Sequence, residues 1–347
     1  MHKTKIFLLL FISLSYFSFA QSKYDHREVF HPFFYPQHGN KVRSASGEPG
    51  PEYWQNKADY SIQATLDLVN HQVTGSMTMI YTNNSPDALS FLWLQLDQNI
   101  YKNNSRASAT TTTQGGRWAN AEYTDGYDVN GVVLTMNGKK QDPKSTHITD
   151  TRMQVWLNEP LKPGGQLQLS MSYQFKIPQY GTDRMGRLRQ KYGWVYEVAQ
   201  WYPRMCVYDD VLGWNTNPYL GAGEFYLEYG DVNYQITAPA NIIVVGSGEL
   251  LNPQECYTEE QFKRWQQARQ SDRTVFIRSA SEVSKVSSRP KSSTITWKFK
   301  CENTRDVAWA ASAAFIIDAA KINLPSGKTS LAVSAYTEES AFEKDAN

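Results

Sequence analysis

Apolar and polar residues alternate over many short segments of the chain, which is the pattern of β-strands that bury one face. The clearest alternation covers residues 60–68, and a turn at Asn70 and His71 leads to a second alternating segment over 73–81. Alternation, or a short apolar run between turn residues, predicts further strands at 91–96, 132–136, 154–157, 167–177, 232–238, 242–245, 275–277, 295–301 and 331–335. Asn137 and Gly138 form the kind of pair that a tight hairpin turn requires. The chain is therefore expected to be mainly β, with a large antiparallel β-sandwich domain.

One segment has a helical pattern instead. Residues 258–272 begin with a capping box made by Thr258 and Gln261, and they place Phe262 and Trp265 on one face. We expect this segment to be the one short helix of the β domain.

A further helix start is predicted near the end of the sequence. Thr337 is a suitable N-cap, and the carboxylates of Glu338 and Glu339 follow it at the positive end of the helix dipole. Only roughly ten residues follow, whereas an isolated helix needs about 12 to 15 to be even marginally stable. We expect residues 336–347 to open a further domain, so that the sequence is the amino-terminal fragment of a longer protein.

The start of the chain has the pattern of a secretory signal. Lys3 and Lys5 precede an apolar run over 6–19, and small residues at Ser18 and Ala20 suit a signal peptidase. The run is too short for a membrane span, and no cysteine follows the cleavage point to carry a lipid. Residues 1–20 are expected to be removed on export to the periplasm or the extracellular space.

Two other segments lack periodicity. Residues 21–56 are rich in proline, glycine and aromatics, and we expect an extended lead-in that lies over the β domain of residues 57–335. Residues 102–124 are small and polar, which predicts a long mobile loop.

Composition narrows the function. The chain is 41% apolar and 20% charged, which suits a globular body, and its net charge of +1 makes nucleic acid an unlikely partner. The three cysteines, Cys206, Cys256 and Cys301, allow either one disulfide with a spare thiol or three buried free thiols.

Aromatic residues are dense between positions 192 and 226, around the carboxylate of Glu197. Rigid aromatics bury much area with few rotatable bonds, so this stretch is a candidate binding surface. A regular strand would place Trp201 on the face of Glu197, although Trp201, Tyr202 and Tyr208 are more typical of a core. Glu197 itself has the alternative of pairing with Arg204 or remaining in solvent.

Asp209 and Asp210 have two interpretations. They resemble the carboxylate pair of a glycosidase, but adjacent strand residues point to opposite faces. Turn-forming aspartates are therefore favoured.

The segment from Glu197 to Arg204, followed by Asp209 and by the strand pair that ends at Pro239, resembles the amino-terminal domain of zinc aminopeptidases of the aminopeptidase N and leukotriene hydrolase family. This resemblance implies a saddle-like antiparallel domain that leans on a separate zinc-bearing catalytic domain. In that family an acidic or amide residue twelve positions before an Asp binds the free amino terminus of a peptide, and Glu197 and Asp209 keep this spacing. The resemblance thus implies peptide substrates and an amine-binding role for Glu197, with Gln200 as second choice, and with Trp201 and Tyr208 as pocket residues.

Catalytic motifs are absent from the sequence. The zinc-binding H-E-x-x-H pattern does not occur, since no histidine is followed by glutamate. His26 and His31 are more typical of surface histidines than of a metal site. We expect this fragment to bind no zinc and to be inactive by itself, with the zinc held in the catalytic domain.

Two alternatives belong to other classes. Trp194, Trp201 and Trp214 suggest a platform that stacks on sugar rings in a secreted carbohydrate-binding β-sandwich module. A purely structural surface domain is the third possibility.

Overall fold

The computed structural model describes residues 39–110, 122–179, 184–221, 223 and 225–341. The predicted signal segment lies outside these residues. The chain divides into two compact units, residues 1–54 and 55–347. None of the helices in the described part of the chain is long and apolar enough to cross a membrane.

The described part of the first unit folds back on itself. Arg43 and Pro49 form an antiparallel bridge, and the side-chain oxygen of Asn40 accepts the backbone N–H groups of Val42 and Arg43 at 2.8 Å each. The expectation of an extended lead-in is therefore wrong for these residues, because asparagine and glycine turns reverse the chain here.

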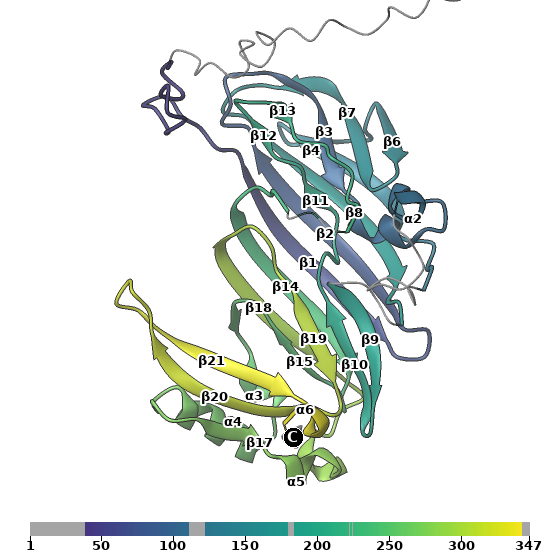
Figure 1. Ribbon diagram of the computed structural model, residues 1–347, viewed down its shortest axis with the longest axis vertical. Helices are drawn as coiled ribbons and strands as arrows, with labels where there is room; N and C mark the ends of the chain where they lie inside the picture. The colour runs from purple at the N-terminus through teal and green to yellow at the C-terminus, as the bar shows by residue number, and fades with distance from the viewer. Residues whose placement is uncertain (1–38, 111–121, 180–183, 222, 224, 342–347) are drawn as a thin grey trace, which may run out of the picture. The chain divides into compact units, whose positions relative to one another are not determined.

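An eight-stranded sheet forms the largest layer of the second unit (Figure 1). Neighbouring strands are antiparallel except β1 and β14, which are parallel. In β1 the side chains of Ala58, Tyr60, Ile62, Ala64 and Leu66 are buried and alternate with more exposed residues, as predicted. The strand order is β16 (Glu249–Leu250), β18 (Thr294–Thr304), β14 (Gly230–Pro239), β1 (Lys57–Asp67), β2 (Gln72–Thr82), β8 (Gln166–Lys176), β4 (Asp128–Met136) and β5 (Lys139–Gln141).

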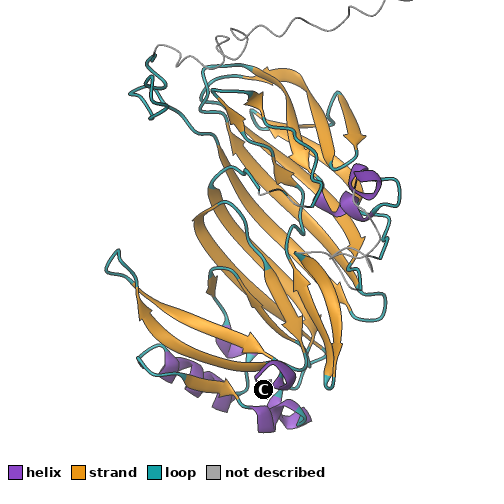
Figure 2. Ribbon diagram, in the orientation of Figure 1, coloured by secondary structure: helices purple, strands orange, loops and turns teal. Residues whose placement is uncertain are grey.

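The described residues also form four smaller sheets (Figures 1 and 2). The first has the order β11 (Arg204–Met205), β3 (Leu89–Gln95), β7 (Arg152–Leu161) and β6 (Ser145–Thr149). The second, which carries the candidate site, has the order β15 (Ile243–Gly246), β19 (Trp309–Ser312), β10 (Gly193–Val198) and β9 (Met185–Gln190). The others are β17 (Val275–Arg278), β20 (Ile316–Asn323) and β21 (Thr329–Tyr336), and the pair β12 (Tyr208–Asp209) and β13 (Gly213–Trp214). The mainly β sandwich predicted from the sequence is confirmed.

The predicted helix is α4 (Glu259–Ala268). Thr258 caps it with the expected capping box to Gln261, Trp265 is buried and Phe262 packs against the core. The described residues form further short helices, so the protein has more helices than the single one predicted for the β domain. These are η2 (Asp97–Tyr101), α2 (Arg106–Thr110), α3 (Pro253–Cys256), α5 (Ala280–Val283), η3 (Val286–Ser288) and α6 (Glu338–Ala341).

Two of these helices bear on predictions from the sequence. Helix α2 lies inside the segment expected to be a mobile loop, where the hydroxyl of Ser105 accepts the backbone N–H of Ser108. The loop prediction is wrong for these residues, and residues 111–121 lie outside the described part. Helix α6 begins at Glu338, where a helix start is predicted.

Candidate functional site

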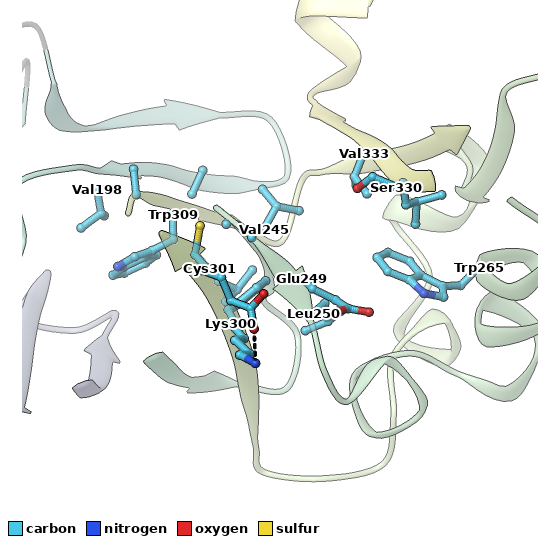
Figure 3. A pocket seen from close by; sticks show the side chains of 18 of the residues that line it. Val198, Val245, Glu249, Leu250, Trp265, Lys300, Cys301, Trp309, Ser330 and Val333 are labelled. Carbon is cyan, nitrogen blue, oxygen red and sulfur yellow. Dashed lines mark ion pairs between the residues drawn. The ribbon is translucent and has the colours of Figure 1, made fainter. Parts of the chain in front are cut away.

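A cavity of about 1190 Å³ lies where three sheets approach one another (Figure 3). Strands β10, β15 and β19 supply one part of its wall, β16 and β18 another, and β21 and α4 the rest. In Figure 3 the sulfur of Cys301 lies between the side chains of Trp309 and Val245. The apolar part of the lining includes Val198, Val245, Leu250, Trp309, Leu331 and Val333.

Glu197 belongs to this wall. Glu197 of β10 lies opposite Ala310 of the antiparallel strand β19. Ala310 in turn lies opposite Val245 of β15. Residues directly opposite each other in a sheet share a face, so these three side chains form one row. All three line the cavity, and the Glu197 side chain is exposed whereas Tyr196 beside it is buried.

Two other carboxylates of the cavity wall have cationic partners. Glu302 pairs with Lys300 at 2.5 Å, and Glu249 pairs with Arg269 at 3.5 Å. Among the described residues, Glu197 has no hydrogen-bond or ion-pair partner for its side chain. Its carboxylate is therefore available to a cation from outside the described structure.

Arg204 does not pair with Glu197. Its guanidinium is buried and binds Asp97 and Asp306 instead. The alternative that Glu197 is neutralised by Arg204 is therefore wrong.

Gln200 lies outside the cavity wall. Its backbone has a left-handed φ of 57°, and its side chain is 2% exposed. Its carbonyl accepts hydrogen bonds from Gln98 at 2.9 Å and from the Tyr127 hydroxyl at 3.0 Å. These contacts hold the turn after β10 against the core.

Trp201 is a core residue. It is fully buried, packs against Tyr202, Tyr234 and Trp309, and donates its indole N–H to the Val307 carbonyl at 2.9 Å. The expectation that Trp201 shares the face of Glu197 fails, because β10 ends at Val198 and the turn at Gln200 redirects the chain.

Tyr208 lies in the short strand β12, away from the cavity lining. Its hydroxyl donates to Asp87 at 2.8 Å and its ring packs edge-on against Trp214. Of the four residues predicted for binding, the structure therefore brings Glu197 to the cavity.

The predicted tryptophan platform is not formed. Trp201 is buried, Trp194 packs against His71, and Trp214 packs against Tyr81 and Tyr208. A surface that stacks on sugars needs exposed ring faces in one plane, so this feature of the carbohydrate-binding alternative is wrong.

Asp209 has the turn-forming role that was favoured. Its Oδ1 accepts the backbone N–H groups of Val211 and Leu212 at 3.0 and 2.8 Å, and Oδ2 accepts from Asn215.

The three cysteines are free thiols, with Cys206 and Cys256 buried and Cys301 partly exposed in the cavity wall. Among the described residues no group of three histidine, cysteine, aspartate or glutamate side chains is placed to hold a metal, so they do not fit a zinc ion.

The remainder of the cavity wall was missed. Val245 was recognised only as part of a buried apolar run, and Trp309, Cys301 and Leu331 carried no signal for a site. These residues come from strands far apart in the sequence, and only the pairing of those strands brings them together.

No known sequence family matches the chain, and no curated protein matches it. Solved structures with a similar arrangement include the M1 zinc metallopeptidase from Deinococcus radiodurans, with 14% identity and a TM-score of 0.44 over 82% of this chain and 48% of that one. A mutant of that enzyme bound to a Tyr-Ser-Ala substrate matches with 13% identity and a TM-score of 0.43, over 82% and 48% of the two chains. A two-domain M1 zinc metallopeptidase mutant bound to L-tryptophan matches with 13% identity and a TM-score of 0.44, over 84% and 50%. The chain thus spans about half the length of these structures.

Proposed function

We propose that this chain is the amino-terminal, substrate-anchoring domain of an exported zinc metalloaminopeptidase, in which Glu197 binds the free amino group of a peptide. The observation that carries this proposal is the carboxylate of Glu197, exposed in the cavity wall without a cationic partner among the described residues. The Glu197 to Arg204 motif, which resembles that of the family, supports the same role.

Selectivity for peptides with a free amino terminus follows from simple electrostatics. An ammonium about 4 Å from a carboxylate gains on the order of 4 kcal/mol at an effective dielectric constant near 20. Desolvation of both charges takes back part of this energy. Because an internal peptide bond carries no cation, a fixed carboxylate restricts cleavage to the first residue of a peptide.

The zinc belongs to another part of the enzyme in this proposal. The described residues contain no ligand set for it. The metal would supply the activated water in the catalytic domain, and this chain supplies the position of the substrate. Export is part of the proposal as well, and the basic residues and apolar run at the start of the sequence support it.

Binding to this chain is the first test. A short apolar peptide with a free amino terminus and its N-acetylated counterpart should be titrated against the wild type and Glu197→Gln. Glu197→Gln keeps the shape of the side chain and removes its charge, so the free peptide should bind about 10-fold to 100-fold more weakly and the acetylated peptide should be unaffected. Glu249→Gln is the matched control, because Glu249 lies in the same cavity and already pairs with Arg269.

Kinetics of the parent enzyme are the second test. Glu197→Ala should raise KM for peptides with a free amino terminus far more than for blocked ones. An equal rise in KM for both kinds of peptide would exclude the amine-binding role. A parent sequence without H-E-x-x-H within roughly 150 residues after Asn347, a distance set by the size of a typical domain, would exclude the zinc peptidase itself.

A further inference from the structure

Two arginines are buried near α4 without a carboxylate partner. Arg278 is 1% exposed and Arg289 is 7% exposed. Arg278 donates to the carbonyls of Ala313 and Phe315 at 2.9 and 2.7 Å, and Arg289 donates to the carbonyl of Ala240 at 2.8 Å. Carbonyl groups satisfy some of the guanidinium protons but carry no net charge. Two positive charges are therefore buried, and among the described residues neither guanidinium forms an ion pair with a carboxylate.

The acidic residue that acts on Arg278 is already engaged. Glu282 accepts from both terminal nitrogens of Arg264 at 2.8 Å each, and it also caps α5 by accepting from Ser279. Burial, followed by the like charge of Arg278, lowers the pKa of Arg289 to about 10. The positive charge of Arg278 thus acts on Arg289, and the one carboxylate that acts on Arg278 is shared with Arg264.

The same region contains buried donors that have no acceptor. These are Nε of Arg278, Nη1 of Arg289, the hydroxyl of Tyr257 and the indole N–H groups of Trp265 and Trp297. The Tyr257 ring stacks on Trp265 at 5.5 Å and meets Trp297 edge-on at 5.4 Å, and the Arg289 guanidinium lies 5.8 Å from the centre of the Trp297 ring. These contacts connect four of the side chains, and Arg278 acts on Tyr257 and Arg289 through its charge. We call the five side chains the arginine–tyrosine cluster.

We propose that the arginine–tyrosine cluster binds a small inorganic anion such as chloride. The unpaired groups of the two arginines and both tryptophans can only donate hydrogen bonds, and the hydroxyl of Tyr257 can donate as well. A buried anion would accept these hydrogen bonds and offset the two positive charges, whereas a water molecule would leave the charges in place. Tyr257 and Trp265 also line the large cavity, so the cluster adjoins it. This inference is independent of any peptidase activity.

The test is the thermal stability of the full chain against anion concentration. Sodium chloride or bromide is exchanged for sodium gluconate at constant ionic strength, so that general screening does not change. We expect a saturable rise in Tm with chloride and bromide that gluconate does not give. Tyr257→Phe keeps the ring and removes one donor, so half-saturation should need about tenfold more chloride, the effect of one hydrogen bond to a charged group.

Tyr173→Phe is the matched control. The hydroxyl of Tyr173 is also buried without an acceptor, but no arginine acts on it. It should leave the chloride dependence unchanged. Arg289→Gln should abolish the dependence, and if that variant does not fold, Tyr257→Phe still decides the question.

Crystals soaked in bromide give a second readout. An anomalous peak between Arg289 and Tyr257 would support the site. Equal Tm values in chloride and gluconate, the same chloride dependence in Tyr257→Phe and Tyr173→Phe, or water density with no bromide peak would each overturn it.

Discussion

Arg204 and Asp97 form a fully buried ion pair in which Nε and Nη2 of the arginine donate to a single carboxylate oxygen, at 3.1 and 2.7 Å. The two residues lie 107 positions apart in the sequence. Asp306 binds the remaining terminal nitrogen of the same guanidinium, and the Tyr202 hydroxyl donates to Asp306 at 3.0 Å. One side chain thereby ties η2 and β11 to the segment that precedes β19.

Removing the arginine should be costly. Arg204→Met would leave Asp97 buried without its cation, and breaking a buried pair in this way costs about 3 to 5 kcal/mol. Unfolding in urea measures this loss. Lys263→Met is the control, because Lys263 and its partner Glu259 are both exposed, and such a surface pair contributes little to stability. Equal losses in the two variants would contradict the argument.

Glu228 should make stability depend on pH. Burial raises the pKa of this carboxyl from an ordinary value of 4.5 to about 7. The folded state then binds a proton more tightly than the unfolded state, so stability is greatest below pH 4.5 and falls as the pH rises through 7. The free energy of unfolding therefore differs by about 3 kcal/mol at most between low and high pH.

Glu228→Gln tests this dependence. An amide oxygen can still accept the N–H of Tyr208, as Glu228 does at 3.2 Å, but it does not titrate. Urea unfolding at both pH values gives the free energy of unfolding of the variant relative to the wild type. This difference should be about 3 kcal/mol larger at pH 8 than at pH 4. A gain that is the same at both pH values would show that Glu228 is not the titrating group.

The capping box of α4 should be worth a measurable part of the stability. Thr258 accepts the N–H of Gln261 at 3.3 Å, and Gln261 accepts the N–H of Thr258 at 3.3 Å. Thr258→Ala should cost about 1 kcal/mol. Thr258→Ser keeps the hydroxyl and should restore most of it. If serine does no better than alanine in thermal unfolding, the hydroxyl is not the stabilising group.

Gly230 should not tolerate a side chain. A Cβ at this position would lie 1.8 Å from the carbonyl oxygen of Ala58, on the neighbouring strand. Backbone cannot yield as a flexible side chain does, so Gly230→Ala should cost 3 kcal/mol or more, roughly the upper end for overpacking. Gly164→Ala has no atom within 4 Å and should lose only about 1 kcal/mol, from its left-handed φ of 72°. Similar melting temperatures for the two variants would contradict this.

Strands with one open face were readable from the alternation of apolar and polar residues, and a short apolar run predicted β15, whereas strands with neither pattern were not readable. In β1 exposed Ser61, Gln63 and Thr65 alternate with buried residues, so the period of two is visible. In β10 the run Trp194, Val195, Tyr196 is apolar on both faces and hides that period. The strands β9, β19 and β20 were missed for related reasons, since their residues are short runs without clear alternation.

The candidate site was only partly predictable. The sequence motif singled out Glu197, which the structure places in the cavity wall. It also singled out Trp201, because a strand that continued past Val198 would place positions 197 and 201 on the same face. The left-handed backbone of Gln200 prevents this, and no residue type at that position signals such a turn, since glutamine rarely adopts it.

The parallel pairing of β1 with β14 has a consequence for how the protein reaches its native state. Tyr60 lies beside Val232, so one edge of β1 has no partner until more than 170 further residues have been synthesised. Such distant pairings slow folding, and an unpaired edge can meanwhile join other chains. Refolding at low concentration, or with a chaperone that shields strand edges, should therefore raise the yield of native protein more than slower dilution of denaturant alone.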